Sequence, residues 1–382
     1  MRYLLIVVAL LRFVTPAAHA HHRQTPPVVA LTTTGDAALP RLAPPSRKAA
    51  AVVVDNSITV VNPFVNPTLP VFQFQAGTNA NPSISSNGRT IAWDSNADPI
   101  GTGAPGRQIV EQSRYLLAQP VSDPTGTSAN PALDLIGVFV AFESTADLAG
   151  TGNPGARQIF LQSSDGTLRQ LSRGVGTSRN PSVGLRGRIV AFESTSDPVS
   201  GADTGVAQIW IANLTAGTAD PVTAGGGAST SPTLSNDGRI VVFESRADLA
   251  GDGHDTGTPQ IFAYDTFSMT FARVTNEPSG CTATTAARIK RDWRIAYLCG
   301  GDAYFTMLRA DARFQIATDG GDTTRLVPQA DAHFVLVATT ADLVGSGTTP
   351  SHRVYMVNLY KRPPAIAPSA VVWFPFRGIP PV

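Results

Sequence analysis

The chain has 382 residues, enough for two average domains or one large domain. Hydrophobic residues make up 42% of it and charged residues 15%, which supplies a core and excludes a coiled coil or an acidic disordered chain. Its 29 basic and 28 acidic side chains nearly balance, so the composition carries no basic surface for nucleic acid or for an anionic membrane.

Residues 1–20 have the pattern of a secretory signal peptide. Arg2 provides a short positive region, an apolar run follows at 4–11, and Ala18-His19-Ala20 supplies small residues before a cleavage site. The apolar run is too short to span a membrane, which needs about 20 residues. We therefore expect a mature protein that is periplasmic or secreted, with no transmembrane segment.

Residues 21–70 are rich in Pro, Ala and Thr and predict a Pro-rich N-terminal linker. One β-branched run, Val52–Val61, interrupts this composition and could form a hairpin that turns at Asp55-Asn56-Ser57. We leave open whether this run is a hairpin or part of the linker.

From residue 71 onward the sequence repeats with a period of about 50 residues. Four clear units share Asn-Pro or Ser-Pro, an apolar run that ends in Asp-Ser or Glu-Ser, a loop with an Asp, and a Gln-Ile pair, and a further unit at 335–355 keeps part of this pattern. The loop aspartates of five units are Asp98, Asp147, Asp197, Asp248 and Asp342. A degenerate unit without the long loop is visible at 294–298 and 302–305, which brings the number of units to six.

Six such units predict an all-β fold, a six-bladed β-propeller of four-stranded blades over residues 71–361, followed by a C-terminal tail at 362–382. The second strand of each unit is apolar without alternation, because blades that pack face to face bury both of its sides. We expect the repeated prolines at the first residue of each innermost strand, where a missing N–H matters least. They are Pro82, Pro131, Pro181 and Pro232.

These repeats resemble the TolB-type β-propeller repeats of exported bacterial proteins. The resemblance rests on the Asn/Ser-Pro, apolar strand, Ser and Gln-Ile-Phe pattern and covers about residues 71–359. TolB carries an α/β domain before its propeller, and residues 21–70 are too short and Pro-rich to form one. Its partnership with the peptidoglycan-associated lipoprotein is therefore not carried over to this chain.

The ring needs closure, because the last unit runs into Pro363-Pro364 before it can supply a fourth strand. Thr68–Phe74 matches the outer strand of a repeat, yet no blade precedes it. We predict that the strand at Val71–Phe74 completes the last blade and removes an open edge.

Cys281 and Cys299 lie nine residues before and after position 290, where the first hairpin of the degenerate unit turns. Equal offsets place them opposite each other on adjacent antiparallel strands, at a Cα spacing that suits a disulfide. An exported protein lives where disulfides persist, so we predict that the two cysteines are paired.

The polar residues that recur in each unit have two interpretations. The pairs Glu143-Ser144, Glu193-Ser194 and Glu244-Ser245 could form a ring of carboxylates. We favour a structural role, in which each pair caps the strand-to-loop turn within its own blade. The loop aspartates and the glutamines before Ile receive the same interpretation.

Catalytic patterns are hard to find in this sequence. It contains no Gly-x-Ser-x-Gly elbow and no zinc-type spacing of His and Cys, and the histidines that survive cleavage are scattered. We therefore expect a non-catalytic binding scaffold for a protein or glycan of the cell envelope. The alternative is a propeller-type polysaccharide lyase or hydrolase.

The functional face follows from the topology of a four-stranded blade. Loops that leave the second strand and linkers between blades must lie on the same side, so we expect a monomer that binds its partner there. On that face Asp248, Asp252 and Asp255 form an oxygen-rich loop that could bind calcium, although it lacks the EF-hand pattern and could be a solvated acidic loop. The aromatic tail at 370–376 is expected to pack on a blade edge or to dock a partner.

Overall fold

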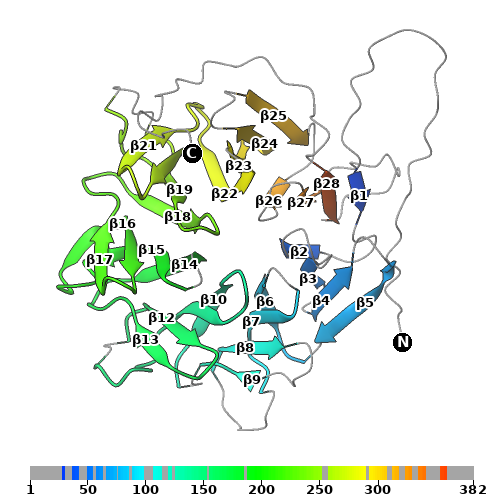
Figure 1. Cartoon of the computed structure of the whole chain (residues 1–382), viewed down its shortest axis with the longest axis horizontal. Helices are drawn as coiled ribbons and strands as arrows, with labels where there is room; N and C mark the ends of the chain where they lie inside the picture. Colours follow the sequence, from blue (N-terminus) through cyan, green and yellow to red (C-terminus); the bar gives the residue numbers. More distant parts are fainter. Residues whose placement is uncertain are drawn as a thin grey trace.

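A computed structural model describes residues 28–30, 37–42, 50–54, 57–62, 66–74 and, with short gaps, 76–358. These residues form β-strands joined by turns and loops, with no helix among them. The strands pair into four-stranded antiparallel sheets, seven in the described part of the chain. Figure 1 shows the sheets as blades around a common centre.

Four blades follow the clear repeats and run from the innermost strand outward. They are β6 (Asn79–Ile84), β7 (Thr90–Ser95), β8 (Gln108–Ser113), β9 (Gln119–Pro120); β10 (Ser128–Leu133), β11 (Phe139–Ser144), β12 (Gln158–Ser163), β13 (Leu168–Gln170); β14 (Ser178–Gly184), β15 (Ile189–Ser196), β16 (Asp203–Asn213), β17 (Thr218–Pro221); and β18 (Ser229–Leu234), β19 (Ile240–Ser245), β20 (Gln260–Asp265), β21 (Thr270–Arg273).

Three further blades complete the ring. They are β22 (Cys281–Ile289), β23 (Asp292–Cys299), β24 (Asp302–Met307), β25 (Ala312–Ala317); β26 (Thr323–Pro328), β27 (Phe334–Thr339), β28 (Arg353–Asn358), β1 (Val28–Ala30); and β2 (Ala37–Leu42), β3 (Ala50–Val54), β4 (Ser57–Asn62), β5 (Asn66–Phe74). Each innermost strand contacts the next one around the ring, including β2 with β26.

The predicted fold class, a β-propeller of four-stranded blades, is confirmed, but the described sheets number seven where we expected six. The additional blade is β2–β5, which lies within residues assigned to the linker except for the last four residues of β5. This segment lacks the Glu-Ser and Gln-Ile motifs, and of the innermost-strand motif it keeps only Pro40, at a register shift between Ala38 and Arg41. The hairpin at Val52–Val61 exists, since Val54 pairs with Ser57.

An N-terminal outer strand does close the last blade, but it is not the strand that we predicted. Strand β1 pairs with β28 in an antiparallel ladder, in which Val28, Val29 and Ala30 are the register partners of Val357, Met356 and Tyr355. The expected strand at 71–74 belongs to β5 and pairs with β4 in its own blade. The ring is therefore fastened by a strand some 40 residues earlier in the chain.

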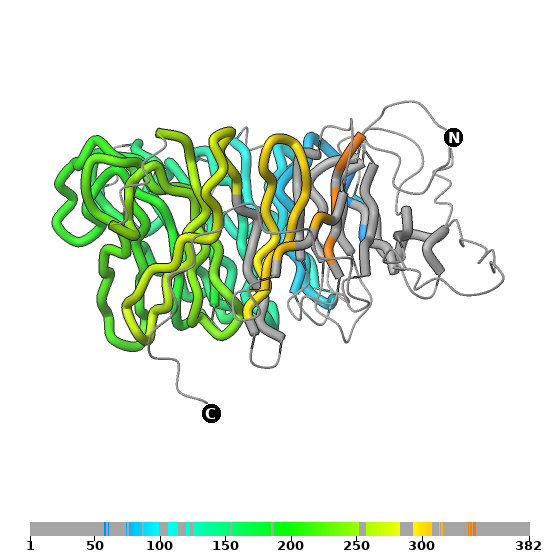
Figure 2. The backbone as a smooth tube through the Cα atoms, turned by 90° about the horizontal axis from the view of Figure 1, so that it is seen from above, coloured from blue at the N-terminus to red at the C-terminus, as the bar shows by residue number. Residues whose placement is uncertain are grey.

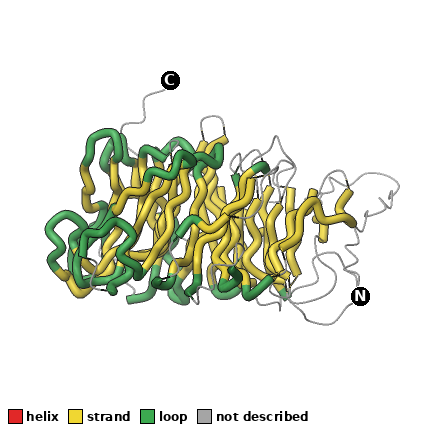
Figure 3. Tube along the Cα trace, turned by 90° about the horizontal axis from the view of Figure 1, so that it is seen from below, coloured by secondary structure: helices red, strands yellow, loops and turns green. Residues whose placement is uncertain are grey.

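The strands run across the thickness of a flat ring, and the connections lie on its two faces (Figures 2 and 3). One face carries the loops from the second to the third strand and the linkers between blades, and we call it the loop-rich face. The other carries the hairpins between first and second and between third and fourth strands, and we call it the hairpin face.

The core lies between neighbouring blades rather than at the centre of the ring. Strand β11 is buried on both sides, with Val140, Ala141 and Phe142 at most 2% exposed, as its unbroken apolar run predicted. The Phe142 ring stacks on Phe160 of β12, with ring centroids 5.9 Å apart. Equivalent ring pairs occur in two other blades, at Phe243–Phe262 and Tyr297–Tyr304.

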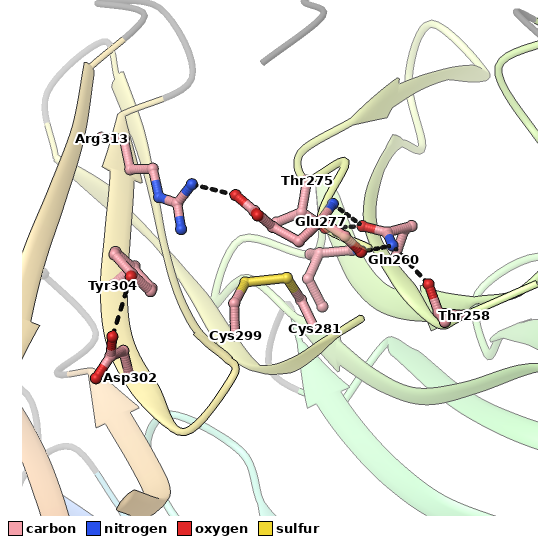
Figure 4. The surroundings of a disulfide bond; sticks show 10 residues. Thr258, Gln260, Thr275, Glu277, Cys281, Cys299, Asp302, Tyr304 and Arg313 are labelled. Atoms are coloured by element: carbon pink, nitrogen blue, oxygen red, sulfur yellow. Dashed lines mark hydrogen bonds and ion pairs between the residues drawn. A yellow bond between two sulfur atoms is a disulfide. The ribbon is translucent and has the colours of Figure 1, made fainter. Parts of the chain in front are cut away.

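The predicted disulfide is present. Cys281 and Cys299 are register partners on β22 and β23, their Cα atoms lie 4.3 Å apart, and their sulfur atoms are bonded. Figure 4 shows the bridge near an ion pair between Arg313 of β25 and Glu277, which precedes the blade. The Arg313 guanidinium also lies 3.9 Å from the ring centroid of Tyr304. These contacts tie the degenerate blade to the linker that leads into it.

Candidate functional site

The loop-rich face begins at a bulge that recurs in the innermost strands. Asn81, Asn130, Asn180 and Ser231 have φ between 47° and 55°, and the register of each strand shifts at this point. Asn tolerates the left-handed region better than most residues, and the Pro that follows needs no ladder partner at a bulge. The prolines therefore lie inside the innermost strands, and our prediction that they begin these strands is wrong.

The bulge explains the repeated carboxylates. The N–H of Asn130 donates to Asp94 Oδ2 at 3.1 Å, and the N–H of Asn180 donates to Glu143 Oε2 at 3.1 Å. The N–H of Ser231 donates to Glu193 Oε2 at 2.6 Å. Each carboxylate thus belongs to one blade and holds the bulge of the next, so it clamps two blades together. We call these three side chains the carboxylate clamps.

This arrangement corrects our interpretation of the Glu-Ser pairs. The serine caps the turn in its own blade, as expected, because Ser144 Oγ accepts the N–H of Ala146 at 3.1 Å and Ser245 Oγ accepts that of Ala247 at 3.1 Å. The carboxylates of Glu143 and Glu193 do not cap that turn, since their backbone donors lie in the next blade. The carboxylates of Glu143 and Glu193 do lie around the ring, but their hydrogen bonds join neighbouring blades.

The clamps differ in their basic partners. Arg107 forms an ion pair with Asp94, and Arg157 forms one with Glu143 at 2.6 Å. In the next unit the equivalent position, directly before the repeated glutamine, is occupied by Ala207. Among the described residues, no basic side chain pairs with Glu193. Burial raises the pKa of Glu143, and the charge of Arg157 opposes this shift.

The glutamines that recur in the repeats also have a structural role, as predicted. Gln158 Nε2 donates to the carbonyl of Gly174 at 2.8 Å, and its Oε1 accepts the hydroxyl of Ser172 at 2.7 Å. Gln208 makes the equivalent bonds to Gly225 and Thr223. These buried amides fix the path of the linker to the next blade.

The two loop sets meet on the loop-rich face. The N–H of Thr145, in the loop after β11, donates to the carbonyl of Thr127, in the linker before β10, at 3.1 Å. The linker approaches so closely that a Cβ on Gly126 would lie 2.5 Å from the backbone nitrogen of Ala146. This contact requires glycine and explains the recurrent Gly in the linkers.

On the loop-rich face, two apolar side chains in neighbouring loops project into solvent. Val175, in the linker before β14, is 69% exposed, and Val199, in the loop after β15, is 60% exposed. Their loops touch, because a Cβ on Gly174 would lie 2.6 Å from the carbonyl oxygen of Gly201. We call Val175 and Val199 the valine pair.

The loop aspartates Asp147 and Asp197 cap their own loops, as expected. Asp147 carboxylate oxygens accept the N–H groups of Thr151 and Gly152 at 2.8 and 2.9 Å. Asp197 accepts the N–H groups of Val199 and Ser200, and these bonds lower its pKa. Asp342 lies outside the described residues.

The calcium candidate is only partly described, and it stays a prediction. Asp248 accepts the N–H of Gly251 at 3.0 Å and forms an ion pair with the buried Arg273 at 2.8 Å. Asp252 and Asp255 lie outside the described residues. Among the residues that are described, no three His, Cys, Asp or Glu side chains gather as a metal site would require.

Comparisons with known proteins show the fold. No family model matches the chain, and no curated protein matches it. Solved structures do. An oligogalacturonate lyase in complex with manganese matches with TM-score 0.57 and 10% identity, over 87% of this chain and 92% of that one. The oligogalacturonate lyase from Vibrio parahaemolyticus matches with TM-score 0.57 and 11% identity, over 87% and 93%.

TolB from Acinetobacter baumannii also matches, with TM-score 0.45 and 13% identity, over 84% of this chain and 78% of that one. At these identities the likeness concerns the fold alone. No helix in the described part of the chain is long and apolar enough to cross a membrane.

Proposed function

We propose that the protein is a non-catalytic exported β-propeller that binds a protein or glycan of the cell envelope through its loop-rich face. The proposal places it in the periplasm or outside the cell, after removal of residues 1–20. The valine pair is the observation that carries it, since two exposed apolar side chains on adjoining, backbone-anchored loops offer a contact surface.

Two further features support a binding role for this face. The carboxylate clamps and the buried glutamines hold the bases of the loops by hydrogen bonds, which makes the framework rigid. The loops above them are rich in Gly, Asn, Asp and Thr, the residue types that adaptable recognition loops use. Calcium bound at Asp248, Asp252 and Asp255 remains part of this proposal.

The test is capture of envelope components by the mature chain, immobilised and exposed to an envelope extract with chemical cross-linking. We expect Val175→Asp with Val199→Asp to abolish capture of the specific component, because charges replace the apolar contact. The matched control is Met269→Asp, which changes an exposed apolar residue on the hairpin face. Equal capture by all three proteins would contradict the proposed face.

The alternative function, a propeller-type polysaccharide lyase or hydrolase, has the fold likeness as its support. Incubation of the mature chain with envelope glycans and chromogenic esters distinguishes the two proposals. We expect binding without turnover, and release of unsaturated or hydrolysed products would favour the alternative.

A further inference from the structure

A cavity lies on the hairpin face, between the blade β10–β13 and the blade β14–β17. Its volume is about 500 Å³, within the range of small-molecule sites. Its wall comes from the β10–β11, β12–β13 and β14–β15 turns and from the residues that follow β16. The lining residues are Ile136, Phe139, Leu161, Ser163, Asp165, Thr167, Arg169, Gly187, Arg188, Leu214 and Thr215. Neither the repeats nor the loop-rich face accounts for it.

The floor of the cavity is apolar. Phe139, Leu161 and Leu214 belong to or pack against the core between the two blades, and Ile136 is exposed at the rim. Gly187 is required here, because a Cβ on it would lie 2.3 Å from the Phe139 ring and its φ is 74°. The Phe139 ring therefore packs directly against the backbone at Gly187.

The rim of the cavity is positively charged. Arg169 of β13 and Arg188 of the β14–β15 turn are exposed, and no side chain in the described part of the chain pairs with either of them. The third charge, Asp165, is turned toward its own hairpin, where it accepts the Ser163 hydroxyl and the N–H of Thr167. Among the lining residues that the structure describes, two positive charges and one negative charge give a net charge of +1.

We propose that this cavity is a binding site for a small organic anion, a carboxylate attached to an apolar group. The apolar group fills the space over Phe139, Leu161 and Leu214, and the carboxylate meets Arg169 and Arg188 at the rim. The hydroxyl of Thr215, which also lines the cavity, adds a donor. The cavity is on the face opposite the valine pair, so an experiment that refutes this proposal does not refute the proposed function, and the reverse also holds.

Calorimetric titration of the mature protein at low ionic strength tests the site with three probes: octanoate, octan-1-ol and acetate. We expect octanoate to bind about three- to tenfold more tightly than octan-1-ol, because exposed arginines contribute modest charge pairing. Acetate is expected to bind at least about tenfold more weakly than octanoate, since it buries little apolar area.

The variant Arg169→Gln with Arg188→Gln is expected to lose the preference for octanoate while it still binds octan-1-ol. Arg173→Gln removes an exposed arginine outside the cavity and should behave as wild type. Both changes concern exposed side chains, so unchanged thermal unfolding confirms that the proteins are folded. Absence of octanoate binding, or an unchanged preference in the double variant, overturns the proposal.

Discussion

Replacement of Cys281 and Cys299 by alanine is expected to lower the free energy of unfolding by about 3 kcal/mol. The bridge closes a loop of 18 residues, and the chain-entropy model assigns such a loop about this contribution. Both cysteines are buried in the core between β18–β21 and β22–β25, so alanine keeps the site apolar. Denaturant titration of the two proteins measures the difference.

Among the six units found in the sequence, the one that holds the bridge has the weakest repeat motif. Its second and third strands are joined by the short turn at Gly300-Gly301 instead of a long loop. The control is reducing agent, which should destabilise the wild-type protein by a similar amount and leave the alanine variant unchanged. A difference below about 1 kcal/mol would show that the covalent link does not compensate for the missing loop.

Gly227→Ala is expected to destabilise the protein by about 2–4 kcal/mol, because the added methyl group meets backbone rather than a side chain that can move. A Cβ at Gly227 would lie 2.7 Å from both the nitrogen and the Cβ of Ala247. The same close approach recurs in the other clear units, at Gly77, Gly126 and Gly176. Thermal or chemical unfolding measures the loss.

The neighbouring residue provides a matched control. A Cβ at Gly226 would meet nothing within 4 Å, and its φ lies outside the region that L-residues avoid. Gly226→Ala should therefore be neutral or should stabilise the protein by up to about 1 kcal/mol, through the unfolded state. Equal effects of the two substitutions would mean that the linker does not rest on Ala247.

The six repeat units could be found in the sequence because their motif residues carry the contacts between blades. The blade β2–β5 could not be found in this way, since only two residues separate the register partners Val54 and Ser57 where the other units have a long loop, and no carboxylate or glutamine of the motif is present. Its Pro content indicated a linker. The neighbouring blades cover this segment in the ring, and that tertiary packing has no signal in local composition.

The roles of the motif residues were only half predictable. Glu143 lies 13 residues after Asn130 and 37 residues before Asn180, and it bonds to both. A single sequence does not reveal which partner a carboxylate clamps, because the answer depends on how the innermost strands stagger around the ring. The cavity on the hairpin face was missed for a similar reason, since its residues come from turns and strand positions outside the repeated motif.

We infer that the repeated carboxylates assemble the ring and leave recognition to the loops above them. The free energy of unfolding of Glu143→Ala tests it most directly. The substitution leaves Arg157, the Asn180 N–H and the Asn130 amide without their acceptor, so we expect a loss of about 1–3 kcal/mol. Asp220→Ala, an exposed carboxylate on β17, should change stability by no more than about 0.5 kcal/mol. A Glu143→Ala protein that is as stable as wild type, or more stable, would contradict this role. Greater stability is the result expected if Glu143 were a strained functional carboxylate.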